Sequence, residues 1–154
     1  ASGRDDRAKG KSVSNATEAR LVAAAATACA DALPAECSVV VLTFYAAQAA
    51  LINRHLSGSD VLAKTVDAAQ GSEADVVLVS FVRANPAGAA GFLRDFRRLN
   101  VALTRAKSLL LSFAHADTLA NLRGDGDDLR ALVHDATDRD LLVPEAECRL
   151  SREL

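Results

Sequence analysis

Continuous apolar runs of strand length constrain the fold of this chain more than any other feature. They do not alternate between apolar and polar residues, so the strands that they predict are buried on both faces, as in a parallel sheet. Segments with helical periodicity alternate with them, which predicts βαβ units and a three-layer α/β fold, a mostly parallel sheet with helices on both faces. Strands are expected at residues 38–43, 61–66, 75–81 and 108–114, and helices at about 15–33, 46–56 and 95–107.

Capping residues mark the starts of two of these helices. Asn15 can cap the first helix, and Glu18, three residues later, can complete a capping box with it. Asp95 can cap the third helix in the same way. A weaker helical pattern continues over residues 117–133, and the glycines of residues 124–126 predict a break within it.

The length and composition predict one folded domain. Of the 154 residues, 50% are hydrophobic and 25% are charged, a balance that excludes a mainly disordered chain. The expected organisation is a mobile lead-in over residues 1–11, the domain over residues 12–134 and an acidic tail over residues 135–154.

Membrane and metal-binding classes are not supported. No apolar run reaches the roughly 18 residues that a membrane helix needs, so we expect no membrane partner and a cytoplasmic or nuclear protein. The three cysteines, Cys29, Cys37 and Cys148, are scattered and form no ligand cluster with the histidines, so no metal site is expected.

The Gly10-Lys11-Ser12 triplet is not the end of a phosphate-binding loop. Such a loop needs a glycine five positions before Gly10, and Asp5 stands there. No apolar strand precedes the triplet, and the acidic pair of residues 5–6 repels a triphosphate. The chain is therefore not expected to act as an independent nucleotide hydrolase.

Positive charge is concentrated in one segment of an otherwise acidic chain. Five arginines and lysines against one aspartate fall within residues 94–107, whereas acidic residues dominate after residue 117. On one helix, Arg98 and Arg105 are seven residues apart and lie at nearly the same azimuth beside the buried face. Guanidinium groups held in this way suit bidentate recognition of phosphate. This segment therefore predicts a local anionic partner, and a solvated helix face remains the alternative.

Two strings in the sequence carry a family resemblance. Residues 65–73 read T-V-D-x-x-Q-G-x-E, and residues 97–107 read R-R-L-N-V-A-L-T-R-A-K. They resemble motifs V and VI of the C-terminal RecA-like domain of superfamily 1 helicases, specifically the up-frameshift and senataxin-like group. Residues 42–48 are similar to motif IV, and the order and spacing of the motifs agree over about residues 12–114.

The resemblance implies a role for each matching residue in a nucleotide site shared by two domains. Arg105 is implied to be the catalytic arginine finger that reaches the γ-phosphate of ATP. Gln70, Gly71 and Glu73 are implied to face the nucleotide, as is Arg98. ATP and Mg²⁺ are implied to be held mainly by an N-terminal RecA-like domain that carries the P-loop.

Other matches imply contacts with the base and with nucleic acid. Tyr45 is implied to stack near the base of the nucleotide, although an ordinary core position remains open for it. Thr43, Thr65 and Arg83 are implied to lie toward single-stranded RNA or DNA, whose phosphates accept hydrogen bonds from such side chains. Asp67 and Gln70 also have the spacing of a helix capping box, which remains an alternative for that segment.

Two functions remain open. The first is the second motor domain of an ATP-dependent RNA or DNA helicase, inactive as an ATPase without its P-loop-bearing first domain. The second is a catalytically silent, helicase-derived docking module for nucleic acid or protein. Because every matched motif belongs to one half of a two-domain motor, and the chain contains no methionine, we expect an excerpt of a longer protein.

Overall fold

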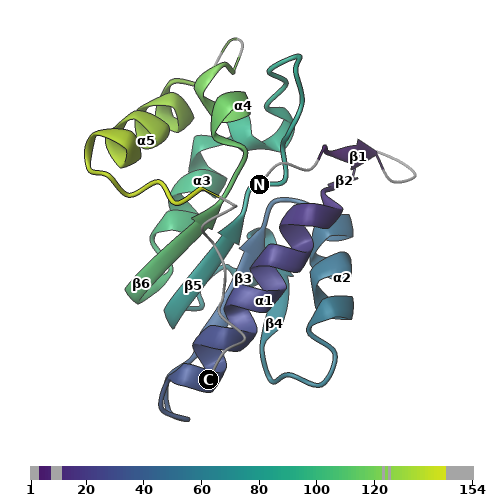
Figure 1. Ribbon diagram of the computed structural model, residues 1–154, viewed down its shortest axis with the longest axis vertical. Coiled ribbons are helices and arrows are strands. Elements are labelled where there is room, and N and C mark those ends of the chain that lie inside the picture. The colour runs from purple at the N-terminus through teal and green to yellow at the C-terminus, as the bar shows by residue number, and fades with distance from the viewer. Residues whose placement is uncertain (1–3, 8–11, 123, 125, 145–154) are drawn as a thin grey trace.

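A four-stranded parallel sheet forms the centre of the molecule in the computed structural model, which describes residues 4–7, 12–122, 124 and 126–144 (Figure 1). Its strand order is β4-β3-β5-β6, and all three neighbouring pairs run parallel. The carboxyl ends of all four strands therefore lie along one edge of the sheet. The strands are β3 (Val39–Thr43), β4 (Leu62–Thr65), β5 (Ala74–Ser80) and β6 (Ala106–Phe113).

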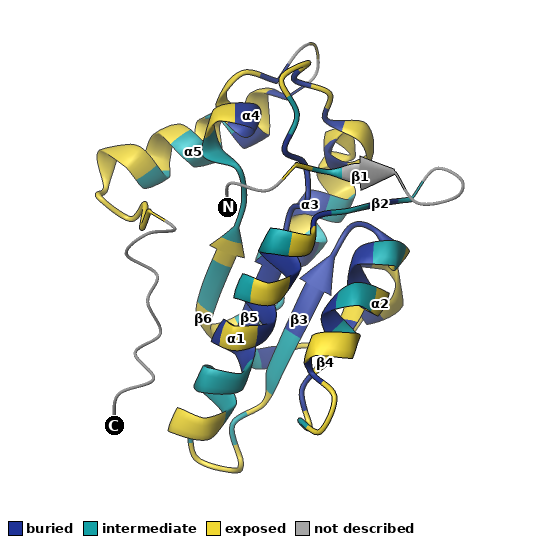
Figure 2. Cartoon of the chain, turned by 45° about the vertical axis from the view of Figure 1, so that its right-hand side comes forward, coloured by how far each residue is buried: buried dark blue, intermediate teal, exposed yellow. Residues whose placement is uncertain are grey.

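Helices cover both faces of this sheet, so the predicted three-layer α/β fold is confirmed. Alternate residues of the central strands feed two separate cores: Val41 and Leu78 pack under α1 and α2, whereas Leu42 and Val77 pack under the C-terminal helices. Figure 2 shows buried residues on β3, β5 and the inward face of α1, and much of α5 exposed. The helices are α1 (Ala16–Ala32), α2 (Ala46–His55), α3 (Phe96–Leu103), α4 (Ala116–Ala120) and α5 (Asp127–Asp138).

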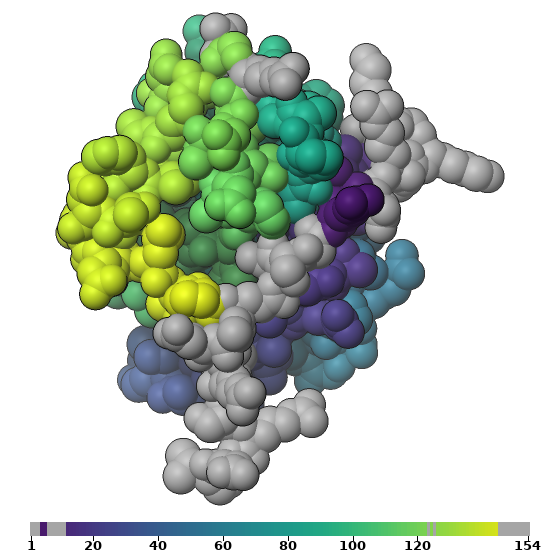
Figure 3. Space-filling view, turned by 45° about the horizontal axis from the view of Figure 1, so that its top comes forward, coloured from purple at the N-terminus to yellow at the C-terminus, as the bar shows by residue number. Residues whose placement is uncertain are grey.

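Part of the expected lead-in is attached to the domain. Strand β1 (Asp6–Arg7) pairs antiparallel with β2 (Val13–Ser14), and Asp5 contacts the segment that follows β5. Figure 3 shows the purple N-terminal segment beside the teal segment that follows β5. Residues 1–3 and 8–11 lie outside the described residues, and so do residues 145–154 of the expected acidic tail. The predicted domain boundaries remain predictions.

The capping prediction for α1 is half correct. The side chain of Asn15 accepts a hydrogen bond from the backbone N–H of Glu18 at 3.1 Å, as expected of a cap. Glu18 does not complete the capping box, because the N–H of Asn15 donates to Gln48 instead, at 2.8 Å. The Glu18 carboxylate accepts from Ser80 Oγ at 2.6 Å and from the N–H of Val82 at 2.8 Å. Tertiary partners have therefore replaced the local one.

The helix predicted over residues 95–107 is shorter than expected. Helix α3 ends at Leu103, and Thr104 closes it by donating from its hydroxyl to the carbonyl of Asn100 at 2.8 Å. Strand β6 begins at Ala106, which pairs with Ala74 of β5. Arg105 therefore lies in the turn between helix and strand, because strand pairing begins earlier than the apolar pattern indicates.

Most of the remaining boundaries agree with the sequence to within two or three residues, and the break between α4 and α5 covers residues 121–126. Helix α5 ends at Asp138, whereas the helical pattern predicted an end near residue 133. Two short 3₁₀ helices, η1 (Asp67–Ala69) and η2 (Gly91–Arg94), follow β4 and precede α3. None of the helices in the described part of the chain combines the length and the apolar character that crossing a membrane requires.

The buried carboxyl group of Glu18 predicts a pH-dependent stability. Burial raises its pKa to about 7 from an ordinary value of 4.5, although the bonds from Ser80 and Val82 act in the opposite direction. The folded state therefore binds the proton more tightly than the unfolded state, and stability is lost as the pH rises from about 4.5 through 7. The loss is on the order of 3 kcal/mol.

A Glu18→Gln variant removes this titration while keeping an oxygen that accepts from Ser80 and Val82. Urea denaturation between pH 4 and pH 8 measures the free energy of unfolding of both proteins. As the pH rises, the unsubstituted chain should lose stability relative to the variant. Parallel curves for the two proteins over this range would contradict the assignment.

Candidate nucleotide site

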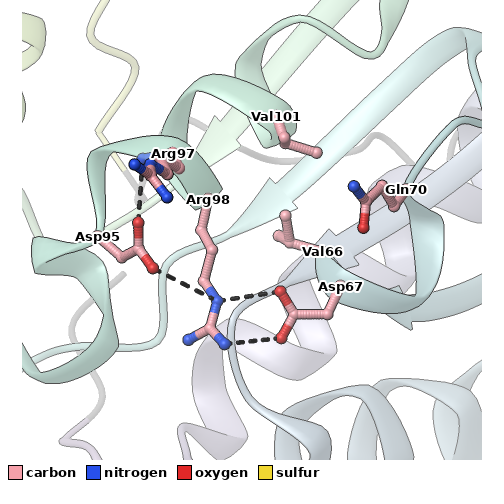
Figure 4. A pocket seen from close by; sticks show the side chains of 7 residues that line it. All are labelled: Val66, Asp67, Gln70, Asp95, Arg97, Arg98 and Val101. Atoms are coloured by element: carbon pink, nitrogen blue, oxygen red, sulfur yellow. Dashed lines mark hydrogen bonds and ion pairs between the residues drawn. The ribbon is translucent and has the colours of Figure 1, made fainter.

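An open pocket of about 220 Å³ lies between the turn after β4 and helix α3 (Figure 4). This position is near the carboxyl edge of the sheet, where parallel α/β proteins place their ligands. Its walls combine two carboxylates, two guanidinium groups, one amide and two valines. The lining residues are Val66, Asp67, Gln70, Asp95, Arg97, Arg98 and Val101.

Arg98 lines the pocket, but its charge is already neutralised within the chain. Its Nε and Nη2 atoms bind the two carboxylate oxygens of Asp67 at 3.0 and 2.9 Å, and Asp95 lies 3.8 Å from Nε. The guanidinium also lies over the ring of Phe92, 5.4 Å from its centroid. Arg98 is therefore a partner of the 3₁₀ turn and of Phe92 in this structure.

Arg105 is held differently. Its Nε donates to the carbonyl of Val101 at 3.1 Å, and its Nη2 lies 3.4 Å from the hydroxyl of Thr104. Val101 belongs to the last turn of α3, where backbone carbonyls lack helical donors, and Thr104 is the residue that closes the helix. No carboxylate in the described part of the chain pairs with Arg105, so its positive charge is retained beside the pocket residue Val101.

The prediction that Arg98 and Arg105 share one azimuth of a helix is wrong, because α3 ends at Leu103. The two arginines still belong to one unit, since Arg98 is part of α3 and Arg105 is hydrogen-bonded to the carbonyl of Val101 in that helix. They differ in their partners, and this difference is not visible in the sequence pattern.

The residues predicted to face the nucleotide form a tight turn. Gln70 closes η1 and lines the pocket, while Glu73 is exposed and lies outside the lining. Gly71 has a φ of +82°, a left-handed conformation that favours glycine. The alternative capping box is absent, because the carboxylate of Asp67 binds Arg98.

Tyr45 does not present a free ring for a nucleotide base in this structure. Only 2% of it is exposed, and its hydroxyl donates to the carbonyl of Ala90 at 3.5 Å and accepts from the N–H of Phe92 at 3.3 Å. Burial raises the pKa of this hydroxyl. A Cβ at Gly91, whose φ is +58°, would lie 2.7 Å from the same oxygen. The exposed ring at this place is Phe92, 5.6 Å from Tyr45 between centroids.

The residues predicted to contact nucleic acid are mostly inside the domain. Thr43 is fully buried, and its hydroxyl has no hydrogen-bond partner among the described residues. Arg83 is buried, with its Nε 2.8 Å from the carbonyl of Ala89 and 3.1 Å from the carboxylate of Asp5. Thr65 is half-buried, and its hydroxyl accepts from the N–H of Ala68 at 3.3 Å. Of these three, only Thr65 retains appreciable access to solvent.

Sequence reasoning missed two residues that line the pocket and one, Phe92, that contacts the pocket residue Arg98. Arg97 lines the pocket with an exposed side chain, and no described carboxylate pairs with it. Asp67 and Phe92 hold Arg98. The doubled arginine of the second motif is a signal for Arg97, but nothing in the sequence alone assigns Asp67 to Arg98.

The described residues do not form a recognisable metal site. They contain no group of three or more histidines, cysteines, aspartates or glutamates arranged to hold a metal ion. Gly10 and Lys11 of the rejected phosphate loop, and Cys148, lie outside the described residues. The hydroxyl of Ser12, the third residue of that triplet, accepts from the N–H of Ala47 at the start of α2, at 3.0 Å.

Comparisons with known proteins agree with this organisation. The family described as "AAA domain" matches residues 1–117, about three quarters of the chain. A fission yeast (Schizosaccharomyces pombe) protein named DNA replication ATP-dependent helicase/nuclease dna2 is 37% identical over 109 residues, 70% of this chain. Helicase sen1 of the same yeast is 49% identical over 80 residues, 51% of the chain. Mouse DNA-binding protein SMUBP-2 is 36% identical over 119 residues, 76% of the chain.

These matches cover 8%, 4% and 12% of the relatives' own lengths, so the chain spans a small part of each of them. The matched family, the parallel sheet and the two motif segments on either side of the pocket all agree. The chain belongs to the Sen1-like group of superfamily 1 helicases, as a C-terminal RecA-like domain of that group.

Proposed function

We propose that this chain is the second motor domain of an ATP-dependent RNA or DNA helicase and that Arg105 is its arginine finger. One observation carries the proposal: Arg105 is anchored at the end of α3 beside the pocket and has no carboxylate partner among the described residues. A guanidinium that is oriented but not neutralised can stabilise the charge that develops on a transferring phosphoryl group.

In this proposal the nucleotide site is formed by residues of two domains. A first, P-loop-bearing domain holds ATP and Mg²⁺, whose chemistry is to neutralise the phosphates. This chain closes over the nucleotide with the pocket between η1 and α3. Gln70 and Arg97 offer an amide and a cation from its walls, and Glu73 lies beyond them on the same turn. Gly71 lets the backbone make that turn.

Single-stranded nucleic acid is the proposed substrate, because the relatives are named helicases or DNA-binding proteins. Thr65, at the carboxyl end of β4, is the best placed of the three residues predicted from the sequence, since it alone is not buried. The resemblance assigns Thr43 and Arg83 to the same track. Their burial favours an indirect contribution, through the sheet edge and through the segment after β5.

A catalytically silent docking module is the second candidate. The observation that favours it is that Arg98 and Tyr45, two of the residues predicted to bind nucleotide, are already engaged within the chain. Such a module would bind nucleic acid or protein without a hydrolytic partner.

The arginine-finger assignment predicts a large and specific loss of turnover. When the chain is fused to a P-loop-bearing RecA-like domain of a superfamily 1 helicase, nucleic-acid-stimulated ATPase activity should appear. Arg105→Ala should lower kcat by on the order of 10³ with little change in nucleotide binding, because the finger acts on the transition state. Arg105→Lys should recover only part of the rate, since an ammonium lacks the guanidinium fork.

Arg54→Ala is the matched control, because Arg54 is an exposed arginine in the last turn of α2, on the opposite face of the sheet. Its turnover should equal that of the unsubstituted fusion. Equal turnover of the Arg105→Ala and Arg54→Ala proteins would contradict the assignment of Arg105 as the arginine finger.

Binding by the isolated chain separates the two candidate functions. A second motor domain by itself should bind a single-stranded oligonucleotide weakly, with a shallow dependence of log K on log salt concentration, because it makes few phosphate contacts. Fluorescence anisotropy over a salt series measures both quantities. Tight binding with a steep slope would instead favour the docking module.

A further inference from the structure

We propose that the Asp67–Arg98 ion pair is a positioning element that fixes the two walls of the nucleotide site relative to each other. Asp67 begins η1 and Arg98 belongs to α3, so the pair joins two segments that are 31 residues apart in sequence. In this role Arg98 acts through Gln70 and Arg105 and is not itself a ligand of the nucleotide. The inference rests on the function proposed above.

The geometry is that of a partly exposed, bidentate ion pair. Two parallel contacts, 3.0 and 2.9 Å long, join the guanidinium fork of Arg98 to both carboxylate oxygens of Asp67. This bidentate arrangement restricts direction as well as distance. Asp95, the cap of α3, adds a second carboxylate, and the ring of Phe92 lies under the guanidinium. Figure 4 shows Arg98 between the two aspartates.

The pair has functional residues on both sides. Gln70 closes the 3₁₀ turn that Asp67 begins, so the position of Asp67 sets that of Gln70. On the other side, Arg105 is hydrogen-bonded to the carbonyl of Val101, one turn along the helix from Arg98. Both Gln70 and Val101 line the pocket. Loss of the pair would therefore change the separation of Gln70 and Arg105 without removing either side chain.

The competing role for Arg98 is that of a direct phosphate ligand, as its motif implies. Asp67 would then oppose nucleotide binding, because a phosphate would have to displace a carboxylate that already occupies the guanidinium fork. The two roles predict opposite effects of removing Asp67. A positioning pair loses turnover when either partner is removed, whereas a ligand restrained by Asp67 binds nucleotide more tightly once Asp67 is neutral.

Kinetics of the two-domain fusion tests this difference. Asp67→Asn and Arg98→Gln should each lower kcat about fivefold, the upper range for a partly exposed ion pair, and leave KM for ATP within about twofold. The double variant, Asp67→Asn with Arg98→Gln, should lose no more turnover than either single variant, because both changes break the same contact. Asp135→Asn, which breaks the exposed Asp135–Arg139 pair of α5, is the matched control and should leave kcat unchanged.

Two results would overturn the proposal. One is a lower KM for Asp67→Asn together with a higher KM for Arg98→Gln, which identifies Arg98 as a nucleotide ligand. The other is a loss of turnover in the double variant equal to the product of the two single losses, which shows that the two residues act separately.

Amide hydrogen exchange of the isolated chain tests the connection without relying on ATPase activity. The N–H groups of Ala69 and Ser72 donate within the turn, to Val66 and Ala69 at 3.2 and 3.1 Å. Their exchange should accelerate about fivefold in both single variants and no further in the double variant. Unchanged rates would overturn the proposal. Accelerated exchange with an inactive unsubstituted fusion would instead reject the proposed motor function and leave the connection standing.

Discussion

The carboxylate of Glu18 holds together the turn on which the rest of the site depends. Val82 follows β5 with a φ of +71°, a conformation that a β-branched residue adopts only when its surroundings impose it. Glu18 accepts from the N–H of Val82, and the side chain of Asn15 donates to its carbonyl at 3.3 Å. The start of α1 thus redirects the chain from the central strand toward Phe92 and α3. The site is therefore positioned from the opposite face of the sheet.

The layered fold could be predicted from the sequence because its causes are local. Buried parallel strands are continuous apolar runs, and Val39–Thr43 and Ala74–Ser80 occur within two residues of where those runs predict them. The end of α3 could not be predicted, because the apolar face of the helix and the start of β6 overlap in sequence. Pairing of Ala106 with Ala74 decides that boundary, and it is a tertiary contact.

The candidate site was predictable as a set of segments but not as a set of contacts. The motifs indicated Gln70 and Arg98, and both line one pocket. They did not indicate that Asp67 neutralises Arg98, or that Phe92 covers the buried ring of Tyr45. Such pairings depend on distances between elements far apart in sequence. The same residue type consequently has different roles: Arg83 and Arg98 are paired with carboxylates, whereas no described carboxylate pairs with Arg105.

The most direct measurement is a crystal structure of the chain fused to a P-loop-bearing first domain and bound to ADP, Mg²⁺ and aluminium fluoride, a planar mimic of the transferring phosphoryl group. The account predicts that a guanidinium nitrogen of Arg105 lies within hydrogen-bond distance of the fluoride, while Arg98 stays on Asp67. A structure in which Arg98 leaves Asp67 to bind the fluoride, with Arg105 still on Val101, would contradict it.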